Sequence, residues 1–321
     1  MKSMKMKILF LVSMLVVLGC KSDGGTGEPV KQEPKEVPEP LAVGYSVAIA
    51  NITADKMSKA KAAGIEYVEA AGTNTFFDGK RDFIKTDAEA ASIMTKAKQA
   101  ADNNGITIWS VHMPYSEEMD LSTINEADRQ KVVAGHKKLL EHLKILKPKV
   151  ILFHPSYYLD PPNQRDLRIS QLIKSVTELN EAVQAIGAVM VVENMLGPEL
   201  MSGARERPLM RTVEEAVDIF KRLPASVYAA IDMNHIKNPE NLIRAMGKRL
   251  KSVHIADGSG RAENHYFPCS GEGQNNWVEI LKALDEAGYQ GPFMFESAYD
   301  SEQALADCYQ TLYNNFIKNI K

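Results

Sequence analysis

Polar side chains end a series of apolar stretches in this 321-residue sequence. Burying a carboxylate or an imidazole is costly unless the group is paired or binds a metal ion. Six consecutive stretches nevertheless end in or near such groups: His112, His154, Glu193, Asp232, His254 and Glu296. Carboxylate oxygens and imidazole nitrogens are ligands that divalent metals accept. If the six stretches converge in the fold, these residues predict a metal site.

The histidines support a shared site. Of the seven in the sequence, His112, His154, His235 and His254 lie at the ends of apolar stretches, and His265 lies in the loop after one of them. The other two fall within a helical pattern, where a surface or packing role is expected. A single buried histidine is usually a core residue, but repetition at equivalent positions favours a common function.

The elements that must position these residues begin at residue 41. Eight short apolar stretches alternate with longer amphipathic ones, which predicts strands, helices and a parallel sheet. The expected strands lie within 41–50, 65–72, 106–115, 149–155, 188–195, 226–235, 250–258 and 291–298. Eight such units in this length favour one α/β domain over residues 41–321, a (β/α)8 TIM barrel, whose strands carry chemistry at their C-terminal ends. The alternative is a doubly wound open sheet, but no Gly-x-Gly-x-x-Gly follows the first stretch.

The N-terminus has the pattern of a secretory signal. A basic start precedes an apolar run that ends in Leu18-Gly19-Cys20, and residues 1–19 are expected to be a signal peptide. The run is short for a membrane span, although an uncleaved anchor helix is the alternative. Residues 20–40 contain Gly, Pro and charges but almost nothing apolar, which indicates a flexible linker.

Composition limits the partners. The hydrophobic fraction of 45% is typical of a globular protein, and the net charge of −3 gives no general attraction to nucleic acid. Besides Cys20, only Cys269 and Cys308 are present, so a disulfide framework is not expected and a single bridge is left open. The sequence also leaves open whether the chain forms a homo-oligomer.

Two family resemblances follow. Leu18-Gly19-Cys20 resembles the lipobox of bacterial lipoproteins, which implies lipidation of Cys20 and a place in the cell envelope. The second is carried by motifs in a fixed order: His-x-Pro-Tyr (112–115), Phe-His-Pro (153–155), Val-Glu-Asn (192–194), Asp-x-x-His (232–235), Val-His-x-x-Asp (253–257), Gly-Glu-Gly (271–273) and Phe-Glu-Ser (295–297). This order resembles the xylose isomerase-like barrel superfamily, which contains sugar isomerases and epimerases, inosose dehydratases and endonuclease IV-type enzymes.

The second resemblance implies roles for named residues. As in ketose 3-epimerases, Glu193, Asp232, His254 and Glu296 are expected to hold one divalent metal (Mn, Co, Zn or Mg). Glu193 and Glu296 are also expected to act as acid and base. The residues expected to bind substrate or further metal ions are His112, His154, His235, His265, Glu263 and Arg261. Glu263 stands where the endonuclease branch has Asp, which weakens the analogy with a three-zinc site.

The expected function is proton transfer on a small carbohydrate, by epimerisation, isomerisation or β-elimination. A location outside the cytoplasm favours free keto-sugars or oxidised glycosides, and the only expected membrane contact is the lipid anchor. One alternative is a zinc phosphodiesterase of the endonuclease IV type, although no basic stripe for nucleic acid is evident. The other alternative is a non-catalytic sugar-binding barrel.

Overall fold

The computed structural model describes residues 37–320. The predicted signal peptide and the lipidation site Cys20 lie outside the described residues. One compact unit begins at Val37, and Pro38 accepts a hydrogen bond from the Tyr313 hydroxyl of the last helix. Among the described residues, no helix is both long and apolar enough to cross a membrane.

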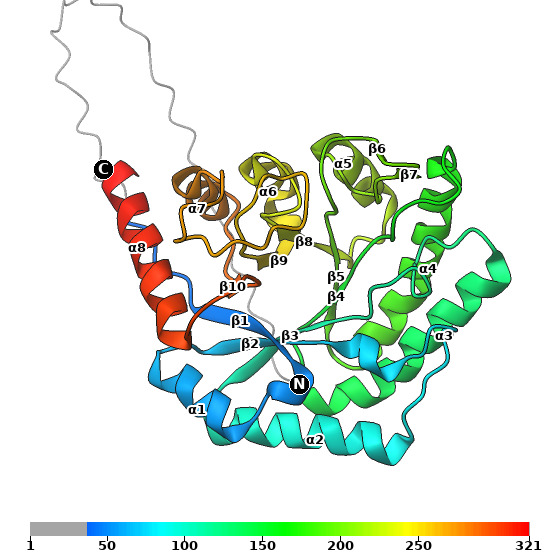
Figure 1. Ribbon diagram of the computed structural model, residues 1–321, viewed down its shortest axis with the longest axis horizontal. Coiled ribbons are helices and arrows are strands. Elements are labelled where there is room, and N and C mark those ends of the chain that lie inside the picture. Colours follow the sequence, from blue (N-terminus) through cyan, green and yellow to red (C-terminus); the bar gives the residue numbers. More distant parts are fainter. Residues whose placement is uncertain (1–36, 321) are drawn as a thin grey trace, which may run out of the picture. The chain divides into compact units, whose positions relative to one another are not determined.

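The fold alternates parallel strands with helices, as the sequence predicts (Figure 1). The strands of the main sheet are β1 (Val43–Ala48), β2 (Tyr67–Ala71), β3 (Thr107–His112), β4 (Val150–Phe153), β5 (Val189–Glu193), β8 (Tyr228–Asp232), β9 (Leu250–His254) and β10 (Phe293–Phe295). The helices are α1 (Ala54–Ala62), α2 (Asp87–Asn103), α3 (Glu126–Leu143), α4 (Arg165–Ala185), α5 (Val213–Arg222), α6 (Pro239–Met246), α7 (Trp277–Glu286) and α8 (Glu302–Ile320). Short 3-10 turns are η1 (Ile49–Asn51), η2 (Thr73–Phe76), η3 (Lys144–Leu146) and η4 (Gly247–Arg249).

The eight-stranded sheet runs in the order β10-β1-β2-β3-β4-β5-β8-β9. A parallel bridge between Ile255 and Phe295 joins its two ends, and Glu296 N donates to Ile255 O at 3.0 Å. This joining confirms the TIM barrel and brings all eight C-terminal strand ends to one side. The open-sheet alternative is excluded.

Two apolar clusters explain why the sequence adopts this arrangement. The larger one lies between the sheet and its helices. A small one, formed by Val150, Leu152, Val191 and Ala230, comes from alternate residues of neighbouring strands. Side chains two residues apart point to the same face of a strand. His154, Glu193 and Asp232 therefore follow this small apolar layer toward the C-terminal side.

A hairpin that the sequence did not predict, β6 (Met201–Ser202) with β7 (Arg205–Glu206), lies between β5 and α5. Leu159 and Glu206 form an antiparallel bridge that fixes the hairpin against the loop after β4. The hairpin therefore belongs to the side of the barrel on which the strands end.

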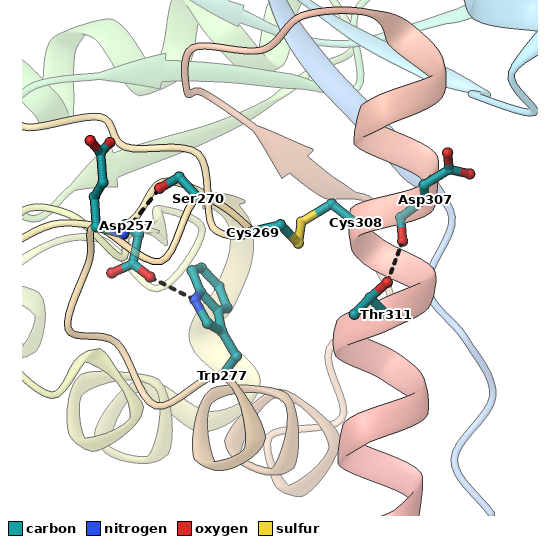
Figure 2. Close-up of a disulfide and its surroundings, with 8 residues drawn as sticks. Asp257, Cys269, Ser270, Trp277, Asp307, Cys308 and Thr311 are labelled. Atoms are coloured by element: carbon teal, nitrogen blue, oxygen red, sulfur yellow. Dashed lines mark hydrogen bonds between the residues drawn. A yellow bond between two sulfur atoms is a disulfide. The ribbon is translucent and has the colours of Figure 1, made fainter.

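The loop after β9 is held at two points (Figure 2). Cys269 in this loop forms a disulfide with Cys308 of α8. The buried Asp257 carboxylate accepts hydrogen bonds from Trp277 Nε1 at 2.8 Å and from the Asn275 amide at 3.0 Å. These contacts tie the loop that carries His265 to α7 and α8.

Removing the disulfide tests its contribution to stability. We expect the Cys269→Ala/Cys308→Ala variant to lose about 2–4 kcal/mol of unfolding free energy, because the bridge constrains the unfolded chain across 39 residues. Denaturant unfolding would measure the loss, with reduced wild-type protein as the matched control. Equal midpoints for the oxidised wild type and the variant would contradict the expectation.

Candidate metal centre

A cavity of about 340 Å³ lies at the C-terminal ends of the strands. It is lined by the ends of β2, β3 and β4 and by the loops after β8, β9 and β10. Six of the residues that the sequence singles out line it: His112, His154, His235, His265, Glu263 and Glu296. The position agrees with the side of a TIM barrel on which active sites form.

The four residues expected to hold a metal form one cluster. Glu193, Asp232, His254 and Glu296 each offer a ligand atom, and these atoms all lie within 4.8 Å of one another. His254 Nδ1 is 3.1 Å from Glu193 Oε1 and 2.6 Å from Glu296 Oε2. The sheet register explains the closeness, because Asp232 and His254 are directly paired neighbours on β8 and β9.

The donor set fits a divalent cation. Three carboxylates converge on one imidazole, and Glu193, Asp232 and His254 are buried. The Oδ2 atom of Asp232 makes no hydrogen bond. A buried carboxylate oxygen without a hydrogen bond is costly, and a bound cation removes that cost.

The charges in the cluster also favour a bound cation. Burial raises the pKa of Glu296, but the neighbouring His254 has the larger, opposite effect. The pKa of Glu296 is therefore lowered to about 2. Burial also opposes protonation of His254, yet Glu296, Glu69 and Glu193 hold its pKa well above the ordinary value. The pKa of Asp232 is raised, by burial first and then by the charges of Glu193 and Glu296. The cluster therefore has more negative charge than its own imidazole balances.

Glu69 is a site residue that the sequence reasoning missed. It lies in the middle of β2, is fully buried, and its Oε2 accepts hydrogen bonds from Ser110 Oγ at 2.7 Å and His254 Nε2 at 3.0 Å. Glu69 thus fixes the proton of His254 on Nε2 and leaves Nδ1 facing the other carboxylates. A carboxylate behind a ligating histidine orients the ring and increases its basicity. The signal was an acidic residue inside an otherwise apolar stretch, IEYVEAAG.

Mutation of Glu69 is expected to weaken metal binding without removing a ligand. Glu69→Ala should reduce the affinity of the cluster for Mn²⁺ or Zn²⁺ on the order of 10- to 100-fold, and Glu69→Gln, which retains an acceptor oxygen, should reduce it less. Calorimetric titration of metal would measure both. Glu66→Gln, on the exposed side of the same segment, is the control. Wild-type affinity in Glu69→Ala would show that Glu69 does not support His254.

Three further histidines share one arrangement. Each donates a hydrogen bond from Nδ1 to a backbone carbonyl: His112 to Met113, His235 to Asn194, and His265 to Glu296, at 2.9, 3.0 and 2.7 Å. The Nε2 atom is then the remaining nitrogen of each ring. Anchoring of this kind is typical of histidines that bind metals.

Histidines at the cavity belong to three more groups beside the four-residue cluster. These are His112, His154 and Glu193; Asp232, His235 and His265; and His112, His254 and Glu296. Glu193 connects the first group to the four-residue cluster, since its Oε2 lies 3.1 Å from His154 Nε2. Asp232 connects the second group, with Oδ2 3.5 Å from His235 Nε2.

The last two predicted residues are placed differently. Glu263 lines the cavity, and its Oε1 lies 3.8 Å from His235 Nε2, although 46% of its side chain is exposed. The structure does not bring Arg261 to the cavity lining. Its side chain is 60% exposed, and its Nε pairs with Glu199 at 3.1 Å.

Comparisons with known proteins agree with the barrel. The D-psicose 3-epimerase of Ruminiclostridium cellulolyticum is 27% identical over 212 residues, which cover 63% of this chain and 67% of the epimerase. Protein MJ1311 of Methanocaldococcus jannaschii is 25% identical over 194 residues, 58% of this chain. The matched region spans 63% of MJ1311, less than two thirds of its length.

Two solved structures share the fold. A D-tagatose 3-epimerase-like protein superimposes with a TM-score of 0.68 at 20% identity, covering 87% of this chain and 99% of that one. The 3-keto-D-glucoside 4-epimerase YcjR of E. coli superimposes with a TM-score of 0.64 at 19% identity, covering 85% and 99%. The family model described as a xylose isomerase-like TIM barrel matches residues 57–313. The chain therefore belongs to the xylose isomerase-like TIM barrel family.

Proposed function

We propose that the protein is a divalent-metal-dependent isomerase or epimerase that acts on a keto-sugar or an oxidised glycoside. The observation that carries the proposal is the position of Glu296, which both lines the cavity and belongs to the four-residue cluster. A carboxylate at the edge of such a cluster can remove the proton next to a substrate carbonyl. The family relation, with relatives such as D-psicose 3-epimerase, supports a sugar as the substrate.

The residues divide the chemistry between them. A divalent cation in the cluster would polarise the substrate carbonyl and stabilise the charge that develops on its oxygen. Glu296, 24% exposed, takes the proton from the carbon next to the carbonyl. The side chain of Glu193 is only 1% exposed. It therefore exchanges protons with the substrate through His154, which lines the cavity and contacts Glu193.

The place of proton return decides the product. Return to the opposite face of the same carbon gives an epimer, and return to the neighbouring carbon gives an isomer. Departure of a β-oxygen instead gives an elimination product. All three outcomes begin with the same proton abstraction by Glu296.

We also propose that the enzyme works in the cell envelope, anchored by lipid on Cys20. The disulfide between Cys269 and Cys308 supports this location, because disulfides persist mainly in oxidising compartments. Keto-sugars and oxidised glycosides without phosphate are the substrates that suit a site outside the cytoplasm.

A metal-dependent phosphodiesterase is the second candidate function. The observation that favours it is that two of the additional groups, His112–His154–Glu193 and Asp232–His235–His265, adjoin the main cluster. Several adjacent cations can stabilise both the attacking and the leaving oxygen of a phosphate ester. The acidic balance of the chain gives this candidate no general attraction for nucleic acid.

One experiment distinguishes the two functions. Chelator-treated protein is incubated with ketoses, oxidised glycosides and abasic DNA, with and without Mn²⁺, Co²⁺, Zn²⁺ or Mg²⁺. We expect NMR to detect a new epimer, isomer or elimination product of a sugar only when metal is restored. Cleavage of the DNA with no change in any sugar would replace the first function with the second.

A further inference from the structure

A second cavity lies beside the first on the same side of the barrel. Its volume is about 440 Å³, and it is lined by the loops after β2, β3 and β4 together with the β6–β7 hairpin. Its lining includes Tyr158 and Arg205, whereas Tyr115 lines the first cavity.

A row of tyrosines connects the two cavities. The ring centroids of Tyr115 and Tyr157 are 5.3 Å apart, and those of Tyr157 and Tyr158 are 5.6 Å apart. All three side chains are half-buried. The guanidinium of Arg205 lies over two of them, 5.2 Å from the Tyr157 ring and 5.7 Å from the Tyr158 ring. The row therefore leads from the metal cluster out to the second cavity.

The charges that line the second cavity favour a neutral ligand. Three arginines and three acidic residues line it. Arg205 pairs with Glu117 at 3.2 Å, and Arg168 pairs with Asp120 at 3.1 Å. Because these charges balance locally, the cavity offers no net attraction to an anion or a cation.

Its polar groups suit hydroxyls. Thr123, Asn125 and Gln164 line the cavity beside the arginines. Their hydroxyl and amide groups can both donate and accept hydrogen bonds, as sugar hydroxyls do. Aromatic faces beside polar donors and acceptors match a sugar ring, which has apolar C–H faces and a polar rim.

We infer that the tyrosine row and the second cavity form a subsite for a neutral second sugar unit, whose oxidised partner ring occupies the first cavity. The inference rests on the proposed function and narrows its substrate class to oxidised disaccharides or longer glycosides. A free monosaccharide would leave the second cavity unfilled.

The test compares two substrates in one variant. Tyr158 lies in the row and lines the second cavity but not the first. We expect Tyr158→Ala to lower kcat/KM for an oxidised disaccharide by roughly three- to tenfold, mainly through KM, and to leave the matching oxidised monosaccharide within about twofold of wild type. Tyr313→Ala, a half-buried tyrosine of α8 that lines neither cavity, is the control and should change neither substrate. An equal effect on both substrates, or on neither, would overturn the subsite.

A binding measurement distinguishes failure of the subsite from failure of the proposed function. If neither sugar is converted, calorimetry with the unoxidised disaccharide and monosaccharide still tests the inference. Tighter binding of the disaccharide, lost in Tyr158→Ala, would support the subsite although the proposed reaction had failed. Equal binding of both sugars, or binding of neither, would overturn it.

Discussion

Replacement of Asp232 with Asn is expected to remove most of the divalent metal from the protein while the barrel stays folded. Asp232 is fully buried, and its Oδ2 faces the cluster without a hydrogen bond. Its Oδ1 accepts from the Asn234 amide at 2.6 Å, and the Asn side-chain oxygen retains that bond. The variant thus loses one negative charge and one ligand oxygen with little change in shape. Metal affinity should fall by on the order of 100-fold or more.

Metal content after dialysis, measured together with thermal unfolding, checks this result. Asp218→Asn, on the exposed surface of α5, should keep wild-type occupancy. If Asp232→Asn retained its metal and its stability, Asp232 would not be a ligand. If Asp232→Asn lost both its fold and its metal, metal binding would be measured instead in Glu69→Ala, which leaves every proposed ligand in place.

The second large effect is expected from Glu296→Gln. Glutamine keeps an oxygen near His254 but cannot accept the substrate proton, so turnover should fall by about 10²- to 10⁴-fold. Steady-state rates of the metal-loaded variant on the best sugar substrate would measure the loss. Glu272→Gln, an exposed residue of the loop after β9, is the control. A loss of less than about tenfold would remove Glu296 from the acid–base role.

Much of the fold was predictable because its signals are local and repeated. All eight apolar stretches contain a strand of the main sheet, since buried parallel strands are nearly continuous in apolar residues. The barrel topology then brings the strand ends together. For this reason the convergence of the polar strand ends was predictable, although they lie far apart along the chain. The choice of Glu193, Asp232, His254 and Glu296 as one ligand set came from the family resemblance, and the structure brings these four together.

Other features depend on geometry that no local pattern encodes. The β6–β7 hairpin has two residues in each strand, too few for an alternating pattern. Glu69 acts from the middle of a strand, and only its contact with His254 reveals its role. The disulfide needed the Cα atoms of Cys269 and Cys308 at 5.8 Å, which spacing along the chain does not predict. The backbone carbonyls that anchor the cavity histidines were equally invisible in the sequence.

The barrel carries two kinds of polar residue at its strand ends. The buried carboxylates around His254 suit a cation, and the half-buried Glu296 connects that cation site to the cavity. The tyrosine row extends the cavity toward the hairpin, outside the region that the strand ends alone would form. Together they fit the proposed substrate, a carbohydrate larger than one ring.

The central claim is proton abstraction next to a carbonyl by Glu296 beside a bound metal. Its most direct test is incubation of the metal-loaded protein with an oxidised disaccharide in deuterium oxide, followed by NMR. We predict that solvent deuterium enters the carbon-bound position next to the carbonyl, and that this exchange disappears in Glu296→Gln. Formation of an epimer without any deuterium at that carbon would contradict the claim.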